Sequence, residues 1–329
     1  MYMLKSILIL ATGASLASAL DFAGYGNKAL DAIKRNLPDI EIIKPRQALC
    51  PAVWTLVAAE LSVTFLNTTD LRCNDDARAA IRAAFHDCAS WNTSVPGGCD
   101  GSLILAPEEL TRPENNGLQE IVAKLLALTQ KYQAIDSSVT AADMIQFASS
   151  VAIVTCPLGP KVQTFVGRTD SSIASTKGLL PGPTTPSADI ITLFANKGIS
   201  ADELIALIGA HSASKQFHVD STQAGVPQDD TPGELDVDFY ADTTSKPAGV
   251  FVLQSDAALA ADPQTSATFQ GFVGKQAQWS AAFTPAMTKL GLLGIKGGST
   301  GLTDCTAAVP LSRVVPRSLV RRQPIMDRV

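Results

Sequence analysis

The feature that most constrains this chain is the three-to-four-residue spacing of its apolar side chains between residues 47 and 306. Such spacing is typical of amphipathic helices. It predicts helices over residues 51–66, 75–86, 117–131, 140–154 and 200–216, with one or two more over 264–290. Alternation of apolar and polar residues is scarce, and residues 249–253 are the best strand candidate. We therefore expect one mainly α-helical unit, with an ordered loop rich in Gly, Pro, Ser and Thr over 157–187.

The composition is that of a folded protein without a nucleic-acid-binding surface. Of the 329 residues, 46% are hydrophobic and 17% are charged, which excludes a disordered chain. A chain of about 300 residues can bury about 75% of its unfolded surface, enough to enclose a bulky cofactor. The formal net charge of -5 and the 6% aromatic content argue against the basic, base-stacking face that a nucleic-acid binder needs.

The first 19 residues have the features of a secretory signal peptide. Lys5 precedes a short apolar stretch, and Ala17-Ser18-Ala19 is an A-x-A cleavage site. The apolar stretch is too short for a membrane anchor, and no later stretch has 18 consecutive apolar residues. We expect a secreted, extracellular protein with no membrane partner. The sequons at Asn67 and Asn92 are consistent with export and predict N-glycosylation.

We divide the chain into four segments. Residues 1–19 are the predicted signal peptide, and residues 20–46 are a pro-segment or an N-terminal arm. Residues 47–306 form the predicted folded domain. Residues 307–329 carry several arginines, and we interpret them as a solvated tail.

An even number of cysteines in an exported chain predicts disulfide bonds. The six are Cys50, Cys73, Cys88, Cys99, Cys156 and Cys305. No C-x-x-C pair is present, so neither a zinc ribbon nor a thioredoxin-type site is expected. Six cysteines allow fifteen pairings, and their spacing alone does not choose among them.

The segment Arg82-Ala83-Ala84-Phe85-His86-Asp87 places three functional groups on one helical face. Arg82 and His86 are four residues apart and therefore project together, and Phe85 lies on the same side. Asp87 points away from this patch. The arrangement suits a pocket in which His86 moves protons and Arg82 stabilises developing negative charge. The alternative is an ordinary helix with a buried histidine and an exposed arginine.

The chain has only two other histidines, His211 and His218. His211 lies late in an apolar segment, and the small residues Gly209 and Ala210 before it leave room for a flat group. A neutral imidazole there can ligate a metal through one nitrogen while a carboxylate holds the other. His218 is seven residues further on, and we interpret it as a surface residue.

An oxygen-rich segment follows each of these two candidate histidines. Asp87 and residues 98–102 follow His86, and Ser212 and residues 229–236 follow His211. Loops that combine carboxylates, hydroxyls and carbonyls suit Ca²⁺, which takes six to eight oxygen ligands. Each segment taken alone also reads as a turn, because Asp-Gly and Pro-Gly are turn dipeptides.

Together these segments resemble the plant, fungal and bacterial haem peroxidase superfamily, most closely its secreted fungal (class II) branch. The matching motifs occur in order between Cys50 and Cys305. They are RxxFHD at 82–87, GGCDGS at 97–102, GRTDS at 167–171, LxGAHS at 207–212, DDTPGELD at 229–236 and LQSD at 253–256. The resemblance implies a two-lobed helical fold with a noncovalent haem b between a distal and a proximal lobe.

The same resemblance implies roles for residues around the haem. His211 would ligate the iron, as a proximal His does in peroxidases, and Asp256 would accept its other N–H. His86 would transfer a proton within H₂O₂, Arg82 would stabilise the charge formed as the O–O bond breaks, and Phe85 would line the cofactor pocket. Asn115 would hold the distal histidine, with Asn116 as a competing candidate and Glu109 as a further link.

Two calcium sites and three disulfides are also implied by the resemblance. The distal Ca²⁺ would bind Asp87, the Gly98 carbonyl, Asp100 and Ser102. The proximal Ca²⁺ would bind Ser212, Asp229, Thr231, the Glu234 carbonyl and Asp236. The pairs Cys73–Cys156 and Cys50–Cys305 match the family, which leaves Cys88 with Cys99, a bridge more like the plant secreted branch.

The electron donor implied by the resemblance is a small phenolic or aromatic compound, which would react at the haem edge after H₂O₂. The positions that match a manganese site are Asp75, Ala79 and Phe217, of which only one is a carboxylate. The position of the exposed tryptophan of lignin-oxidising relatives is Ala206. We expect a monomer. The alternatives are a catalytically weak, secreted haem- and calcium-binding glycoprotein and a metallohydrolase that uses His86-Asp87, although three histidines are few for a clustered metal site.

Overall fold

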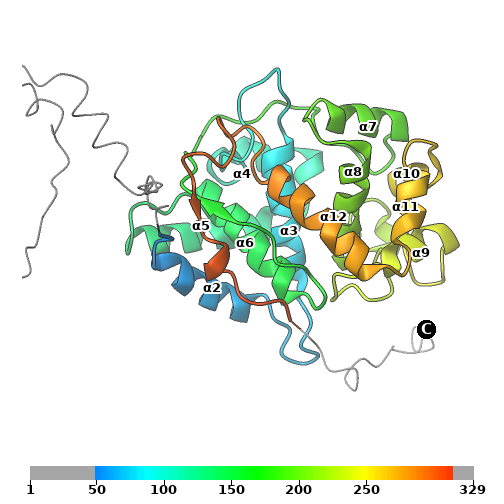
Figure 1. Cartoon of the computed structure of the whole chain (residues 1–329), viewed down its shortest axis with the longest axis horizontal. Coiled ribbons are helices and arrows are strands. Elements are labelled where there is room, and N and C mark those ends of the chain that lie inside the picture. Colours follow the sequence, from blue (N-terminus) through cyan, green and yellow to red (C-terminus); the bar gives the residue numbers. More distant parts are fainter. Residues whose placement is uncertain (1–48, 314–329) are drawn as a thin grey trace, which may run out of the picture. The chain divides into compact units, whose positions relative to one another are not determined.

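The computed structural model describes residues 49–313, and these residues are predominantly helical, as the sequence predicts (Figure 1). The predicted signal peptide at 1–19, the segment 20–46 and the part of the tail beyond 313 lie outside the described residues. The helices are α2 (Val53–Thr64), α3 (Asp75–Ala89), α4 (Ser102–Leu105), α5 (Gln119–Gln133), α6 (Ala141–Thr155), α7 (Ser187–Ala195), α8 (Ala201–Ile208), α9 (Asp238–Ser245), α10 (Gln254–Ala261), α11 (Ser266–Phe272) and α12 (Gln276–Leu290).

Short 3-10 helices connect several of these elements, and a single small sheet joins two distant segments. The 3-10 helices are η1 (Pro107–Thr111), η2 (Pro113–Asn115), η3 (Gly209–Ala213), η4 (Ser221–Gln223) and η5 (Thr306–Ala308). The sheet pairs β1 (Phe165–Val166) with β2 (Thr303–Asp304) in antiparallel register, with Phe165 opposite Asp304.

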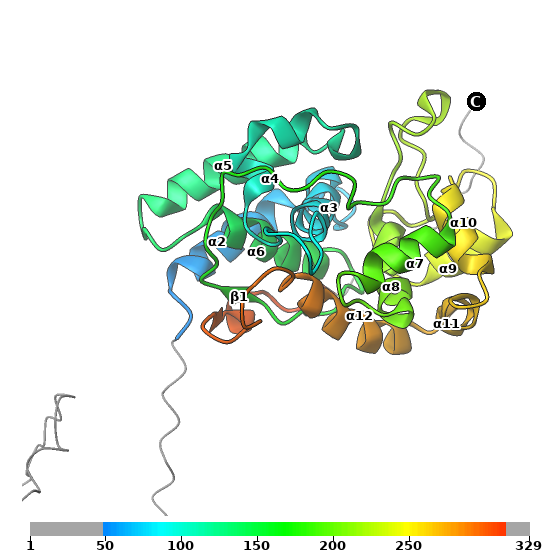
Figure 2. The ribbon, with the colours of Figure 1, turned by 90° about the horizontal axis from the view of Figure 1, so that it is seen from above.

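The helices form two groups that correspond to the two expected lobes. In the first group, α2, α3 and α5 pack against α6, every residue of which is buried. In the second group, α8 packs against α12, and α9, α10 and α11 pack on one another. Figures 1 and 2 show the first group together on one side and α7 to α11 on the other, with α12 running between them. The two candidate histidines belong to different groups, because His86 lies on α3 and His211 follows α8.

Side-chain caps explain where three of the helices begin. Asn74 accepts a hydrogen bond from the N–H of Ala77 at the start of α3, and Thr140 accepts one from Asp143 at the start of α6. Ser200 and Glu203 form a reciprocal capping box at the start of α8. Each cap satisfies backbone donors that the first helical turn leaves free.

Two of the expected elements differ from the structure. The helix predicted over 200–216 ends as an α-helix at Ile208 and continues only as the 3-10 helix η3. The prediction of a strand over 249–253 is wrong, because this stretch is an extended loop in which Phe251 donates one backbone hydrogen bond to Pro227. The observed strands β1 and β2 are two residues long, too short to produce a detectable alternation.

The three expected disulfides are all present: Cys50–Cys305, Cys73–Cys156 and Cys88–Cys99. The first residues of the predicted tail also pack on the domain. Val309 is buried, and the N–H of Arg313 donates to the carbonyl of Val154. Among residues 49–313, no helix is both long and apolar enough to cross a membrane.

Candidate active site

The first half of the site is built on α3, where Arg82 and His86 are in contact. Nε of Arg82 lies 3.1 Å from Nε2 of His86. The two terminal nitrogens of Arg82 donate to the carbonyls of Asn116 and Glu114, each at 2.8 Å. The guanidinium is therefore fixed from behind by the loop after η2, and it faces the same imidazole that the helical spacing predicts.

Asn115 fixes the other side of the His86 ring. Its Oδ1 lies 2.7 Å from Nδ1 of His86, and its Nδ2 donates to the carbonyl of Glu109 at 2.8 Å. Because the amide nitrogen is engaged there, Oδ1 accepts a hydrogen bond from Nδ1–H of His86, so that Nδ1 carries the proton and Nε2 is the basic nitrogen. Asn116, the competing candidate, is exposed and contributes only its backbone carbonyl.

Glu109 supports this arrangement through its backbone. Its carboxylate accepts hydrogen bonds from the N–H and the hydroxyl of Ser175, and it is completely buried. Arg112, also buried, donates to the hydroxyl and the carbonyl of Ser175. The predicted link between Glu109 and Asn115 therefore exists, but it passes through the Glu109 carbonyl.

Burial dominates the electrostatics of the distal pair. Burial and, to a lesser extent, the nearby Arg82 charge lower the pKa of His86, the hydrogen bond with Asn115 opposes both, and the resulting pKa is about 3. Burial also lowers the pKa of Arg82 to about 10. At neutral pH, His86 is therefore a neutral base beside a charged guanidinium.

Phe85 completes the distal patch. Its ring meets that of His86 edge to face, with centroids 5.6 Å apart, and stacks on Phe194 of α7 at 6.0 Å. Since α7 belongs to the second group of helices, this aromatic contact joins the two groups beside the site.

The second half of the site is the pair His211 and Asp256. His211 lies in η3, and its Nδ1 is 2.9 Å from Oδ2 of Asp256 in α10. Asp256 is buried and also accepts a hydrogen bond from Gln228. Burial lowers the pKa of His211, but the charge and hydrogen bond of Asp256 outweigh this effect, so that its pKa is raised overall.

The two histidines share one electrostatic environment. The Arg82 charge that lowers the pKa of His86 also lowers that of His211, although the two rings lie on different groups of helices. Arg82 therefore lies within electrostatic reach of both imidazoles. That the two rings face a common space stays a prediction.

His211 has the properties of a ligand to a flat metal complex. Asp256 engages Nδ1, while Nε2 has no hydrogen-bond partner within residues 49–313. The side chain keeps 37% of its surface open, although the ring lies deep among the packed helices. Ala210 before it is small, and Gly209 allows close packing of η3, since a Cβ there would lie 2.3 Å from Nε1 of Trp279. The residues present therefore fit a haem iron bound through Nε2.

The predicted distal calcium ligands converge next to His86. Asp87 is buried, and its two oxygens accept hydrogen bonds from the N–H groups of Gly101 and Leu103, each at 3.3 Å. The N–H of Ser102 donates to Asp100 at 3.1 Å, whereas the buried Ser102 hydroxyl has no partner within the described residues. Burial raises the pKa of Asp87 well above its ordinary value, and Asp100 raises it further.

Gly98 lies in the same loop, at a close approach between two chain segments. Its φ is +111°, and a Cβ there would lie 2.3 Å from the carbonyl oxygen of Leu293. Only glycine tolerates both conditions. The Cys88–Cys99 disulfide ties this loop to the end of α3.

The predicted proximal ligands also converge. The hydroxyl of Thr231 lies 2.7 Å from carboxylate oxygens of both Asp229 and Asp236. The N–H of Gln228, the residue before Asp229, donates to the carbonyl of Ser214, two residues after Ser212. Glu234, whose carbonyl is a predicted ligand, belongs to the same loop. The side-chain carboxylate of Glu234 forms an ion pair with Arg72, with Nη2 of Arg72 at 2.6 Å from Oε1.

The chemistry of this second group fits a cation. The hydroxyl of Ser212 and one oxygen of Asp229 are buried without a partner among residues 49–313. Burial and mutual repulsion raise the pKa of Asp229, and burial raises that of Asp236. No ion pair compensates either carboxylate in the described part of the chain. Oxygen ligands held in this way, around a buried negative charge, are what Ca²⁺ requires.

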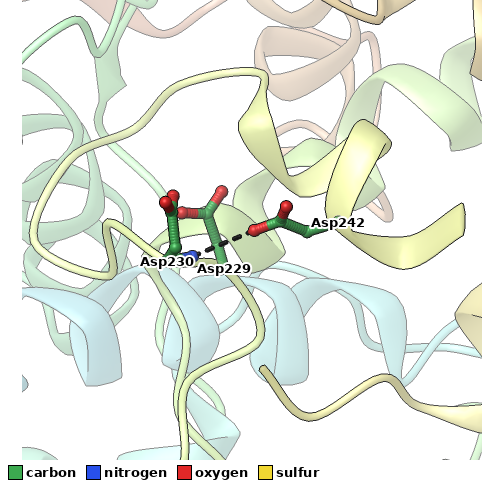
Figure 3. A group of neighbouring side chains, drawn as sticks. All are labelled: Asp229, Asp230 and Asp242. Atoms are coloured by element: carbon green, nitrogen blue, oxygen red, sulfur yellow. Dashed lines mark hydrogen bonds between the residues drawn. The ribbon is translucent and has the colours of Figure 1, made fainter. Parts of the chain in front are cut away.

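The structure adds two carboxylates that the sequence analysis missed. Oxygens of Asp229, Asp230 and Asp242 lie within 4.8 Å of one another. Figure 3 shows Asp242 reaching from helix α9 toward the loop, where it accepts a hydrogen bond from the N–H of Asp230 at 3.1 Å. Asp230 lay within the quoted motif, but nothing in the sequence indicated that Asp242, in α9, would return to it.

His218 is exposed, as predicted, but it lies close to the distal site. Its Nε2 is 3.0 Å from the position that a Cβ on Gly117 would take, and Nη1 of Arg82 is 3.5 Å from the same point. Phe217 and Val219 beside it are also exposed. The His218 imidazole therefore borders the side of the site on which Arg82 lies.

Comparison with known proteins agrees with this geometry. A family model described as "Peroxidase" matches residues 60–275. Manganese peroxidase H4 of Phanerodontia chrysosporium is 31% identical over 322 residues, covering 87% of this chain and 81% of that protein. A low-redox potential peroxidase of Taiwanofungus camphoratus is 33% identical over 276 residues, covering 78% and 77%. A peroxidase of Arthromyces ramosus is 30% identical over 283 residues, covering 78% and 75%.

The helical fold and the paired histidines define the class as a haem-dependent oxidoreductase that uses H₂O₂. The chain belongs to the peroxidase family, and its relatives are fungal class II enzymes.

Proposed function

We propose that this protein is an extracellular enzyme that reduces H₂O₂ and oxidises small phenolic or aromatic donors at the haem edge. The observation that carries the proposal is the state of His86, a neutral base whose Nδ1 is held by Asn115 and whose Nε2 faces Arg82. The resident groups would be haem b and two Ca²⁺ ions. His211 would hold the haem iron, oriented by Asp256.

The bound iron would supply the electron exchange with peroxide and donor, and the protein residues would manage protons and charge. Nε2 of His86 would accept the proton of the peroxide oxygen that approaches the iron. His86 would then return this proton to the second oxygen, which leaves as water. His86 ends neutral, as it began. Arg82, charged throughout, would stabilise the negative charge on the departing oxygen.

The proposed calcium ions would hold the two histidines in place. Asp87 directly follows His86, and Ser212 directly follows His211. A cation bound by Asp87, Gly98, Asp100 and Ser102 would anchor the end of α3. A second cation bound by Ser212, Asp229, Thr231, Glu234 and Asp236 would anchor η3. Their binding also neutralises carboxylates that are otherwise buried without a counter-charge.

The donor is proposed to be a small organic molecule and not Mn²⁺, although three related enzymes are named manganese peroxidases. Asp75, one of the three matching positions, forms ion pairs with Arg78 and Lys215. The other two positions are Ala79 and Phe217, which offer no carboxylate. Ala206 is completely buried, so this position exposes no aromatic ring.

The test is an absorption spectrum of the purified holoenzyme before and after H₂O₂, followed by phenol oxidation. We expect a ferric haem band that changes with peroxide and saturable oxidation of the phenol, without saturable oxidation of Mn²⁺. His86→Ala should slow the reaction with peroxide by about 100-fold or more, whereas His218→Ala should leave that step unchanged. A haem band without phenol oxidation would favour the alternative, a catalytically weak haem- and calcium-binding glycoprotein.

A further inference from the structure

A second cavity lies apart from the proposed active site, beside the C-terminal half of α12. Its volume is about 710 Å³. Most of its lining comes from α12 (Thr284, Pro285, Thr288 and Lys289) and from the segment that follows it (Leu292, Leu293, Gly294, Ile295, Lys296 and Gly298). Elsewhere in the chain, it is lined by Trp91, Gln163 and Lys197. None of Arg82, His86, His211 and Asp256 lines it. The cavity is therefore a separate site, with a volume in the range of small-molecule pockets.

The charged side chains that line this cavity are all lysines. Three lysines line it, with no aspartate or glutamate. Lys289 is paired with Glu203 at 2.7 Å, and Lys296 is exposed. Lys197 is only 3% exposed, and its Nζ donates to the carbonyl of Leu179 at 2.9 Å. No carboxylate pairs with Lys197 among residues 49–313, so this ammonium is a buried cation without a counter-ion.

A buried cation of this kind is costly to the protein. Burial lowers the pKa of Lys197 to about 8, which leaves the side chain mostly charged at neutral pH. A hydrogen bond to one carbonyl compensates such a charge poorly, whereas an anion compensates it well. The arrangement is therefore more favourable when an anion occupies the cavity.

The rest of the lining is apolar and partly flat. Leu292, Leu293 and Ile295 provide aliphatic surface, and Trp91 and Pro285 provide ring surfaces. A small inorganic anion would leave this surface unused, and a dianion would need more than one unpaired buried cation. The lining instead suits a ligand with one negative charge and a flat apolar body.

We propose that this cavity is a binding site for small aromatic carboxylates, with Lys197 as the partner of the carboxylate and the ring held among Trp91, Pro285 and Leu292. The proposal does not depend on peroxidase activity. It assigns the protein a ligand site in addition to the one that contains the histidines.

Binding can be measured by calorimetric titration of the holoenzyme with 2-naphthoate. The uncharged 2-naphthamide, which has nearly the same shape, is the control ligand. We expect saturable binding of the carboxylate and at least about tenfold weaker binding of the amide. The haem absorption spectrum, recorded in the same titration, identifies binding at the proximal or distal histidine, because binding in the proposed cavity should leave the spectrum unchanged.

Two variants test the location. Lys197→Met removes the charge but keeps the length of the side chain, and Leu292→Trp adds bulk to a half-buried wall of the cavity. Each should weaken binding of 2-naphthoate at least about tenfold. Lys161→Met is the matched control, since Lys161 also donates to a backbone carbonyl, at 2.6 Å from Val309, but lies outside the cavity. This control should bind like the parent protein.

Three results would overturn the proposal. One is absence of saturable binding by the parent holoenzyme at millimolar 2-naphthoate. Another is equal affinity of the parent protein and both cavity variants. The third is binding that always changes the haem spectrum, which would place the ligand at the active site. None of these results bears on whether H₂O₂ is reduced, so failure of this proposal is distinguishable from failure of the proposed function.

Discussion

The imidazole of His86 is controlled from both of its nitrogens by residues of different kinds. Oδ1 of Asn115 accepts a hydrogen bond from Nδ1–H of His86 at 2.7 Å, and Nε of Arg82 lies 3.1 Å from Nε2. The first contact selects the tautomer, and the second keeps a positive charge next to the basic nitrogen. Removing the Asn115 contact should therefore disturb proton transfer without removing any group that touches peroxide.

We predict that Asn115→Ala lowers kcat/KM for H₂O₂ by about tenfold to hundredfold, because His86 loses its fixed tautomer and orientation. The rate of the first reaction with peroxide, followed by stopped-flow absorbance, measures this effect. Asn116→Ala is the matched control, since Asn116 contributes only its carbonyl to the site. Equal rates for the two variants would show that the contact with Nδ1 is unimportant.

A second residue-scale prediction concerns Lys197 and pH. Burial lowers the pKa of the Lys197 ammonium from its ordinary value of 10.5 to about 8 in the folded protein. Below pH 8 the Lys197 side chain is protonated in both the folded and the unfolded protein, and the folded protein bears the full cost of the buried charge. Between these two values the unfolded chain binds more protons than the folded protein, so stability contributed by this group rises with pH. The other charged residues of the cavity are Lys289, paired with Glu203, and Lys296.

Lys197→Met should therefore stabilise the protein at pH 7, by about 1–2 kcal/mol after allowance for solvent screening. The gain should shrink as pH rises from 8 toward 10.5. Denaturant unfolding of the two holoproteins across this range measures it, with Lys161→Met as the control substitution. A gain that grows with pH would mean that the sign of this argument is wrong.

At the scale of elements, each histidine is carried by a helix whose end joins an oxygen-rich loop. The end of α3 is tied to the loop at 98–102 by hydrogen bonds to Asp87 and by the Cys88–Cys99 disulfide. The proximal element η3 has no disulfide within residues 49–313, and hydrogen bonds between Ser214, at its end, and Gln228 join it to the segment that leads into the loop at 229–236. The proximal histidine should therefore depend more on bound calcium than the distal one.

We predict that removing calcium lowers peroxidase turnover and alters the absorption bands that report iron ligation by His211. Metal analysis must confirm depletion, and added Ca²⁺ should restore both signals. Asp229→Asn should retain less calcium than Asp230→Asn, because Asp229 is buried with an unpartnered oxygen whereas Asp230 is exposed. Unchanged turnover in fully depleted protein would refute the anchoring role.

These elements also show how far the sequence alone reaches. The four-residue spacing of Arg82 and His86 is local, and the structure brings the two side chains into contact as that spacing predicts. The change from α8 to η3 at Gly209 was not predictable, because it depends on the close approach of Trp279 and Tyr240. Local patterns carry no information about such distant partners.

The same limit applies to the site and to the cavity. The resemblance indicated the Asp256 partner of His211, but no pattern pointed to Asp242, which comes from a different helix. Lys197 lies in an unremarkable segment between α7 and α8, and only burial distinguishes it from other lysines. The strand prediction at 249–253 was wrong because five apolar and small residues without a pairing partner form no sheet.

At the scale of the whole molecule, the three disulfides constrain loops of very different length. Cys50–Cys305 joins residues 255 apart and links the two ends of the described chain. Cys73–Cys156 spans 83 residues, and Cys88–Cys99 spans 11. In the chain-entropy account, the longest loop contributes about 5 kcal/mol and the shortest about 3 kcal/mol, through the unfolded state.

We therefore predict that loss of the Cys50–Cys305 bridge mainly lowers stability, whereas loss of the Cys88–Cys99 bridge mainly lowers turnover. Replacing Cys50 and Cys305 by Ala should lower the free energy of unfolding more than replacing Cys88 and Cys99, because it frees the longer loop. The Cys88 and Cys99 double variant should lose more turnover, because this bridge holds the loop of Asp100 and Ser102 against α3. Both are measured on holoprotein at the same saturating Ca²⁺, by denaturant unfolding and by phenol oxidation. The prediction would be wrong if loss of Cys88–Cys99 lowered stability more and loss of Cys50–Cys305 lowered turnover more. Loop length would then not determine the effect on stability, and the position of the loop beside α3 would not determine the effect on turnover.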